Sequence, residues 1–560
     1  MKRRSLLRVA ADLFIPPYLD LMGRLEARRI SRRAKDPMRL QRALLERILR
    51  ENAQTRFGKE HGFPALGSYE AYARAVPVME FEALRPYIDA EIERGESALT
   101  QEEPIQYMRT SGSTGKPKDI PLTRSHLRAL RAIQRTSVAF QYRACPEAFR
   151  GSILAIVSPA EEGRLANGKA FGAASGIVAA GTPRLVQAKF VLPLEVHGVA
   201  DPSLKYLLIL RLALAHDDLT YFGSANSTTP LALMKLYREH YAWLVEDVRR
   251  GGFSRLEELD AATRDAVADR LGADPVRAEE LERLNAANRQ RMADLWPRLR
   301  LLVTWTCGSA GVTVRALRGE LPEQTKIFEL GYLSSEFRGT FSLRPHPGTG
   351  LPTFETHFLE FCERRKWDAG ERDCVPLDQL RKGVDYYVVA TTQSGLYRYF
   401  INDIVRVTGY LHRTPLLKFM QKGKGVTNIT GEKLYEAQVL QAVDAALSRR
   451  GMNARFVMML ADEDSRRYRL YVEPDPRPLA DAAELARDVE ARLCDLNIEY
   501  ASKRGSDRLD ALHAAWLQRE SGEAYKRYCV TAGQREGQFK SAALAYRSAF
   551  GFDLEAHAVG

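Results

Sequence analysis

This 560-residue chain lacks long apolar runs, paired cysteines and a Walker-type phosphate loop. No segment reaches the roughly eighteen consecutive apolar residues of a membrane-spanning helix. The six cysteines are scattered without any Cys-x-x-Cys pair. This spacing predicts neither a zinc site nor a disulfide framework, and it fits a reducing, cytoplasmic location. Arg8 and Asp12 interrupt the apolar stretch after Arg3 and Arg4, so we expect no cleaved export signal.

Positive charge is concentrated at one end of the chain. Residues 1–50 carry fourteen Lys or Arg and five Asp or Glu, a net +9 out of a formal +12 for the whole chain. Because no basic stripe continues beyond them, we expect no nucleic-acid binding. Apolar residues in the same segment allow two interpretations, a helix packed on its own domain or weak contact with an anionic membrane surface. These residues are Leu6, Leu7, Leu13, Phe14 and Ile15. We predict no obligate protein partner.

A small, hydroxylated loop punctuated by glycine spans Thr110 to Lys118. Glycine allows sharp turns and close approach to a ligand, and consecutive backbone N–H groups in such a loop form a concave site for phosphate oxygens. The spacing differs from that of a Walker A motif. A flexible surface loop is the alternative interpretation, and the clusters further along the chain favour a nucleotide site. The candidate phosphate contacts are Ser111, Gly112, Ser113, Thr114, Gly115 and Lys118.

Alternating helical and strand-like segments predict an α/β fold. The first hundred residues have mostly helical patterns. Ser125 is expected to cap a helix from His126 to about Tyr142. Buried strands are expected at 152–157, 219–222, 301–306 and 326–330.

The chain is expected to divide into two domains near residues 421–425, where two glycines lie among polar residues. The large N-terminal domain, residues 1–422, would consist of helix-covered sheets. Residues 423–560 would form a small α+β domain that moves on a hinge.

Four further clusters follow the loop in a fixed order. They are Cys307–Gly311, Glu329–Glu336, Gly395–Asp403 and Asn428–Leu434. The ring of Tyr332 is suited to stacking on an adenine, and the Glu336 carboxylate to holding Mg²⁺, which prefers oxygen ligands. The Asp403 carboxylate is suited to accepting hydrogen bonds from both ribose hydroxyls. Each residue alone also fits a core ring, a solvated strand end or a turn, and only the shared order favours a nucleotide site.

This order resembles the adenylate-forming enzymes, the superfamily of acyl-CoA synthetases, luciferases and peptide-synthetase adenylation domains. Within it, the chain is most similar to the auxin-responsive-promoter-type acyl-acid amido synthetases, whose plant members conjugate jasmonate and indole acetate to amino acids. The similarity runs from Asn52–Gly58 to Gly537–Lys540. Tyr332-Leu333-Ser334-Ser335-Glu336 matches the Tyr-x-x-Ser-Glu of that family, whereas acyl-CoA synthetases favour glycine after the tyrosine.

The resemblance implies a set of site residues. The ATP site would also include Ser309, Ala310, Gly311, Tyr332, Ser335, Asp403 and Lys422. The acyl substrate would contact Phe222, Gly223 and Ser224. Glu336 would serve Mg²⁺, and Lys540 would be the mobile lysine that reaches the α-phosphate. Lys422 stands where relatives usually have arginine, and Phe400-Ile401-Asn402 departs from the usual Tyr-Arg-x-Gly-Asp pattern before its aspartate.

The implied activity is ATP- and Mg²⁺-dependent adenylation of a small carboxylic acid, followed by transfer of the acyl group to an amine, such as an amino acid. Two alternatives stay open. One is a ligase of the same superfamily that passes the acyl group to coenzyme A or a carrier-protein thiol. The other is a non-catalytic descendant that serves as a scaffold or ligand-binding subunit.

Overall fold

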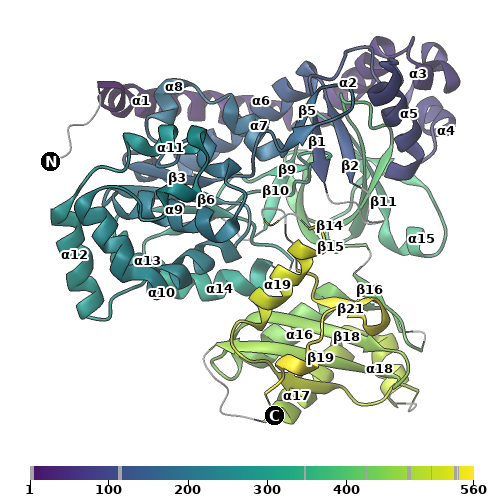
Figure 1. Cartoon of the computed structure of the whole chain (residues 1–560). Helices are drawn as coiled ribbons and strands as arrows, with labels where there is room; N and C mark the ends of the chain where they lie inside the picture. The colour runs from purple at the N-terminus through teal and green to yellow at the C-terminus, as the bar shows by residue number, and fades with distance from the viewer. Residues whose placement is uncertain are drawn as a thin grey trace.

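A large domain and a smaller C-terminal domain make up the computed structural model (Figure 1). The structure describes residues 6–110, 117–308, 310–345, 348–423, 425–430, 432–475, 481–505, 508–534, 536, 539 and 541–559, without the side chains of Thr110 and Val312. Candidate residues Ser111, Gly112, Ser113, Thr114, Gly115, Ser309 and Lys540 therefore lie outside the described residues.

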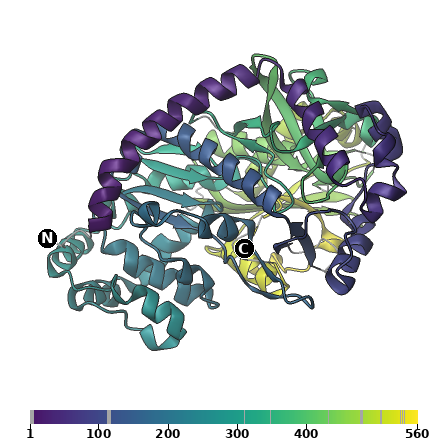
Figure 2. The same cartoon turned by 90° about the horizontal axis from the view of Figure 1, so that it is seen from above.

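Five helices open the chain, as the sequence predicts. They are α1 (Leu6–Arg33), α2 (Pro37–Glu51), α3 (Arg56–Glu60), α4 (Tyr69–Ala75) and α5 (Phe81–Arg94). The side chains of Asp36, Thr55 and Ser68 cap the second, third and fourth of these by accepting backbone N–H bonds. The longest, α1, runs along the outer edge of the large domain (Figure 2). No described helix is long and apolar enough to span a bilayer.

A four-stranded parallel sheet forms the first layer of the large domain. Its strands, in spatial order, are β3 (Ser152–Ile156), β6 (Leu219–Ser224), β7 (Leu301–Thr304) and β8 (Lys326–Glu329). All four agree with the strands expected from the sequence to within two residues. The main helices packed around the sheet are α6 (Arg124–Ala144), α9 (Pro202–Leu214), α10 (Thr228–Arg250) and α14 (Ala310–Glu320). Thr123, and not Ser125, caps α6 by accepting the His126 N–H, so the predicted cap was wrong by two residues.

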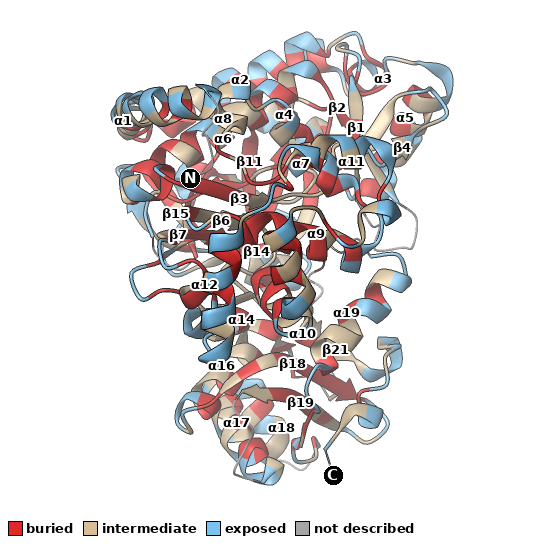
Figure 3. Cartoon of the chain, turned by 60° about the vertical axis from the view of Figure 1, so that its left-hand side comes forward, coloured by how far each residue is buried: buried red, intermediate tan, exposed pale blue. Residues whose placement is uncertain are grey.

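Smaller helices complete this layer. These are α7 (Ala174–Ala180), α8 (Arg184–Gln187), α11 (Ala261–Ala268), α12 (Pro275–Ala286) and α13 (Met292–Leu295). The buried residues that Figure 3 shows in red include the central strands and the sheet-facing sides of the helices.

The second layer is a seven-stranded sheet built of antiparallel pairs. Its order is β12 (Cys374–Pro376), β11 (Phe358–Glu363), β13 (Asp385–Thr391), β14 (Tyr399–Leu411), β15 (Thr414–Lys422), β10 (Thr349–Pro352) and β9 (Thr340–Phe341). Helix α15 (Arg364–Asp368) lies between β11 and β12 in the chain. A third sheet, which flanks the Gly-rich loop, contains β2 (Lys118–Leu122), β1 (Gln106–Thr110), β5 (Ala170–Gly172) and β4 (Gly163–Arg164).

The C-terminal domain has its own sheet and core. The sheet order is β20 (His513–Trp516), β19 (Arg467–Asp475), β18 (Asn453–Asp462) and β21 (Leu544–Tyr546), beside the short pair β16 (Val426–Thr427) and β17 (Leu434–Tyr435). Its helices are α16 (Glu436–Ser448), α17 (Ala482–Leu496), α18 (Ile498–Gly505) and α19 (Ser521–Thr531). Ion pairs Arg315–Asp444 and Lys235–Glu520 join it to the large domain. The predicted fold class is confirmed, whereas the boundary at residue 422 and the mobility stay predictions.

One expectation about the cysteines was wrong. Cys362 and Cys374 lie directly opposite each other on the antiparallel strands β11 and β12, with Cα atoms 4.2 Å apart, and form a disulfide. Their separation of twelve residues carried no signal in the sequence, because only the strand register brings the two thiols together. The four remaining cysteines, Cys145, Cys307, Cys494 and Cys529, are free.

We therefore expect four titratable thiols in the denatured protein without reductant, and six after reduction. Because the disulfide closes a short loop, its loss should lower the free energy of unfolding of this sheet by about 3 kcal/mol. A Cys362→Ala/Cys374→Ala variant should unfold at a lower urea concentration than the wild type. Dithiothreitol should lower the urea midpoint of the wild type and leave that of the variant unchanged. Six thiols without reductant would contradict the pairing.

Candidate active site

A cavity of about 400 Å³ lies between the two domains, at the carboxyl ends of the parallel strands. Ligands of open α/β sheets usually bind at this edge. From the large domain the cavity is lined by Asn226, Trp305, Ala310, Glu329, Tyr332 and Phe419, among others. Helix α19, both long strands of the C-terminal sheet and residues Phe539 and Ser541 line the other side. Four separate parts of the sequence thus converge on one space.

Tyr332 and Asp403, two candidates from distant motifs, are in direct contact. The Tyr332 hydroxyl donates to Asp403 Oδ2 at 3.0 Å, and its ring stacks on Phe419 with centroids 5.5 Å apart. Burial raises the pKa of Tyr332 well above its usual value, so the hydroxyl stays a donor. Gly331, at φ 105°, leads into this position, where a Cβ would clash with the Thr340 carbonyl. Tyr332 and Phe419 thus line the cavity with stacked rings, and Asp403 holds the Tyr332 hydroxyl in place.

Asp403 and Lys422 face each other across strands β14 and β15 in the antiparallel register. Asp403 is buried, while Lys422 is exposed at the end of β15. The preceding Asn402 has a left-handed φ of 59°, and the Gly423 N–H donates to its carbonyl at 2.7 Å. At the departure from the usual family pattern, residues 400–402, the register of β14 with β13 is irregular, and Asp403 still lies buried on β14 next to the chain's exit from the large domain.

Tyr399 connects two further candidates. Its hydroxyl donates to Glu336 Oε1 at 3.2 Å, and Lys118 Nζ lies 3.3 Å from the same hydroxyl. Lys118 begins β2, directly after the Gly-rich loop, and its ammonium also lies over the Phe81 ring. A cation and a carboxylate are thus held on either side of one phenol at the end of the loop. Tyr399 belongs to the Gly395–Asp403 cluster, but its contacts were not predictable, because only the fold brings it between these residues.

A buried ion pair fixes the backbone that carries Tyr399. Arg398 Nε and Nη2 donate to the fully buried Glu360 at 2.8–3.1 Å, and Arg398 Nη1 donates to the carbonyls of Ala73 and Val76. Arg398 itself has a left-handed φ of 41°, a conformation that costs energy for a side chain with a Cβ. These charge-assisted bonds hold the start of β14 against β11 and the end of α4.

The loop between β7 and α14 is organised by Glu329. This buried carboxylate accepts the Thr306 N–H at 2.7 Å and the Gly331 N–H at 3.0 Å, so it joins the ends of two neighbouring strands. Burial raises the pKa of Glu329. Ala310 and Gly311 follow in the first turn of α14, where the Gly311 N–H donates to the Gly308 carbonyl. Sequence reasoning did not single out Glu329, which precedes the Tyr-x-x-Ser-Glu motif.

The expected acyl contacts lie on two different faces of β6. Phe222 is fully buried in the hydrophobic core with residues of α9 and α10, so it does not line a ligand space. Ser224 is also buried, and its hydroxyl donates to the Asn226 carbonyl. Gly223 shares the opposite face with Tyr221, which donates to Gln141 of α6 at 3.1 Å. Because side chains alternate along a strand, Phe222 and Ser224 lie on one face of β6, and Tyr221 and Gly223 lie on the other face, which is directed towards α6.

Arg338 is a site candidate that the sequence did not reveal. Its Nη1 donates to Gln134 of α6 at 2.6 Å, and its Nε is buried without a partner. The guanidinium also lies near Tyr221, and burial lowers the pKa of Arg338 to about 10, so it is charged at neutral pH. No carboxylate of the described residues forms an ion pair with it. A half-buried cation without an anion, placed between α6 and β6, is suited to binding an anionic ligand.

Metal binding would depend on a single carboxylate. Among the described residues, no group of three His, Cys, Asp or Glu side chains gathers into a metal cluster. Glu336 lies at the loop end of the site, where phosphate oxygens would supply further ligands. Mg²⁺ is commonly held by one or two carboxylates together with substrate phosphates, and Glu336 fits this pattern.

The buried ion pair between Arg398 and Glu360 is expected to contribute strongly to the free energy of unfolding. Arg398→Met would leave Glu360 charged, buried and unpaired, and we expect a loss of about 3–5 kcal/mol in the free energy of unfolding. Arg406→Met on the same strand is the matched control, because Arg406 is 44% exposed and its pair with Asp385 should contribute less than about 1 kcal/mol. Urea denaturation measures both, and equal midpoints for the two variants would contradict the anchoring role.

Comparisons with known proteins agree on one family. The chain matches the GH3 family N-terminal domain over residues 26–326, the central domain over 350–422 and the C-terminal domain over 437–548. A rice protein named probable indole-3-acetic acid-amido synthetase GH3.12 is 28% identical over 91% of each chain. The jasmonoyl–L-amino acid synthetase JAR6 of Nicotiana attenuata is 25% identical over 74% of each chain.

Solved structures share the fold. The AtGH3.15 acyl acid amido synthetase in complex with 2,4-DB superposes with a TM-score of 0.84 over 96% of both chains, at 21% identity. A 2-hydroxyisobutyryl-CoA ligase in complex with 2-HIB-AMP superposes with a TM-score of 0.56 over 92% of this chain and 89% of its own, at 15% identity. The N-terminal match alone covers more than half of the 560 residues, and the chain belongs to the GH3 family.

Proposed function

We propose that this protein adenylates a small carboxylic acid with ATP and then transfers the acyl group to an amine, namely that of an amino acid. The observation that carries the proposal is the pairing of Tyr332 with Asp403, and of Glu336 with Lys118 through Tyr399, beside an inter-domain cavity at the strand ends. The amido synthetase names of its relatives support the same reaction.

The chemistry requires activation of the acid. A free carboxylate is a poor electrophile, because its leaving group would be oxide. In the first step a carboxylate oxygen bonds to the α-phosphorus of ATP while the bond to the bridging oxygen breaks and pyrophosphate leaves. In the second step an amine attacks the acyl carbon, loses a proton and displaces AMP. No protein nucleophile is needed, so the residues contribute position and charge.

Different candidate residues would bind the ribose, the adenine and the phosphates of ATP. Asp403 would accept the ribose hydroxyls, while Tyr332, Ala310 and Gly311 would border the adenine. The Gly-rich loop and Lys118 would bind the phosphates, with Ser335 nearby and Lys422 at the outer edge. Lys540 would reach the α-phosphate, and the cavity-lining positions of its chain neighbours Phe539 and Ser541 support this role.

Magnesium fits the same end of the site. Glu336 would hold Mg²⁺ together with ATP oxygens, and the ion would neutralise charge on the departing pyrophosphate. Tyr399 orients the Glu336 carboxylate by donating to one of its oxygens.

The acyl acid is assigned to the space between α6 and β6. Arg338 would attract the substrate carboxylate there, while Tyr221 and Gly223 would border its tail. The amine would enter from the side of the C-terminal domain, because residues of that domain line the inter-domain cavity. A rotation near Gly423 and Gly425 would reshape this entrance between the two steps.

The decisive experiment measures ATP-dependent pyrophosphate release, trapped with hydroxylamine, across aryl, indole and fatty acids. We expect release with at least one acid class, and a loss of about 10²–10³ in rate for Glu336→Gln. Amino acids should then replace hydroxylamine as acceptors. Release of AMP that depends on coenzyme A instead would favour the thioester ligase, and failure to bind ATP would contradict both enzymes.

Substitution of Arg338 separates acid binding from ATP binding. Because a charged hydrogen bond contributes about 1.5–3 kcal/mol, Arg338→Leu should raise the KM for the acid roughly ten- to hundredfold and leave the KM for ATP unchanged. Arg344→Leu, at an exposed position in the same segment, is the control and should change neither constant. An unchanged KM for the acid in Arg338→Leu would show that its charge does not contact the substrate.

A further inference from the structure

The outward face of α1 is apolar over most of its length. Its large apolar side chains are between 47% and 90% exposed. They are Leu6, Leu7, Val9, Leu13, Phe14, Tyr18, Leu21 and Leu25. Single exposed leucines are ordinary on a protein surface, but a contiguous series on one helix marks an interaction site.

The helical repeat places these side chains in rows that end in basic residues. Leu7, Phe14 and Leu21 are spaced by seven residues, and Arg28 and Lys35 continue the same row. Tyr18 and Leu25 form the next row, which Arg32 continues. The outward face is therefore apolar in its first two-thirds and cationic in its last third and the adjoining turn.

The basic part borders a concavity at the end of α1. Its cationic lining consists of Arg24, Arg28, Arg32, Lys35 and Arg143. Arg24 pairs with Asp20, whereas Arg28, Arg32 and Lys35 form no ion pair with any residue that the structure describes. Three cations thus face outward beside the apolar rows without a fixed counter-charge.

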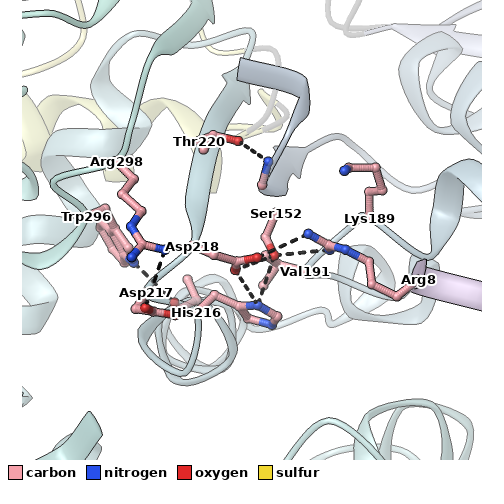
Figure 4. A network of polar contacts seen from close by, with 12 residues as sticks. Arg8, Ser152, Lys189, Val191, His216, Asp217, Asp218, Thr220, Trp296 and Arg298 are labelled. Carbon is pink, nitrogen blue, oxygen red and sulfur yellow. Dashed lines mark hydrogen bonds and ion pairs between the residues drawn. The ribbon is translucent and has the colours of Figure 1, made fainter. Parts of the chain in front are cut away.

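The inward face of α1 is fastened to the large domain. Arg8 donates to Ser152 and Asp218 at 3.2 Å, as Figure 4 shows, and Lys189 pairs with Asp12. Further along, Thr136 of α6 donates to Glu26 at 2.8 Å. Since polar contacts hold one side of the helix along its length, the opposite side is presented to the exterior as a preformed surface.

We propose that the outward face of α1 docks on the surface of a membrane that contains anionic phospholipids. The leucines, Phe14 and Tyr18 enter the boundary between headgroups and acyl chains, and Arg28, Arg32 and Lys35 contact the anionic headgroups. Charge complementarity selects this occupant, because an apolar strip that continues into unpaired cations matches the two layers of an anionic membrane surface.

A second copy of the chain fits this face poorly. A two-fold symmetric antiparallel pairing would place the basic end of each helix against the apolar rows of the other. A parallel pairing would bring Arg28, Arg32 and Lys35 against the same residues of the partner copy. Both arrangements bury cations without counter-charges, which is costly.

Vesicle sedimentation of the full-length protein tests the proposal. We expect binding to phosphatidylcholine vesicles that contain phosphatidylglycerol, and weak binding to pure phosphatidylcholine or at high salt. Phe14→Glu/Leu21→Glu should lower the partition coefficient at least tenfold. Arg28→Glu/Arg32→Glu/Lys35→Glu should lower it roughly a hundredfold, at about fivefold for each cation.

Matched variants control for charge and hydrophobicity elsewhere on the surface. Val276→Glu/Ile498→Glu replaces two apolar residues that are even more exposed than Phe14 and Leu21, and Arg365→Glu/Lys366→Glu/Lys382→Glu reverses three other exposed cations. Both should bind vesicles like the wild type, and all variants should keep the wild-type urea midpoint. Equal binding by the α1 variants and the wild type would overturn the proposal, as would no binding to anionic vesicles. A dimer in sedimentation velocity that Phe14→Glu dissociates would assign the face to a second copy instead.

Discussion

The ion pair between Arg398 and Glu360 is the contact on which the arrangement of the site depends. It is buried, and Arg398 has a left-handed conformation directly before β14. The next residue, Tyr399, holds Glu336 and Lys118, and Asp403 follows four positions later on the same strand. One fixed strand therefore sets the distance between the phosphate end and the ribose end of the proposed nucleotide site. The buried ion pair stabilises this strained backbone conformation and thereby keeps the ligand-binding residues of β14 in fixed positions.

The pairing of β14 with β15 also connects this anchored strand to the C-terminal domain. Asp403 is opposite Lys422, and the chain leaves β15 directly after that lysine. The second domain thus begins directly after a strand that is paired with the anchored strand β14. A rotation about Gly423 and Gly425 would change what faces the cavity from the C-terminal side, while Tyr332 and Asp403 would keep their places. A fixed nucleotide site beside a changeable C-terminal side of the cavity suits a reaction in which the nucleotide stays bound while the acceptor amine enters.

The features that could be predicted from the sequence are those that depend on residues close together in the chain. The strands that end at Thr304 and Glu329 were predictable to within two residues, because apolar runs are local signals. The contact of Tyr399 with Glu336 and that of Arg338 with Gln134 join residues 63 and 204 positions apart, so only the fold reveals them. The same holds for the disulfide, which depends on register. Phe222 lies in the core because strand parity decides which face its side chain occupies, and the periodicity of the sequence alone does not fix that parity.

Helix α6 relates the proposed acyl side to the outer surface. Thr136 faces α1, where it contacts Glu26, whereas Gln134 contacts Arg338. Two residues advance a helix by about 200°, so these side chains project to opposite sides. In the docked arrangement that we propose, α1 and α6, each about 10 Å across, lie between the lipid surface and Arg338. An acid with an apolar tail partitions into that surface and becomes concentrated beside the enzyme. The membrane docking that we propose would therefore suit an acyl acid with an apolar tail.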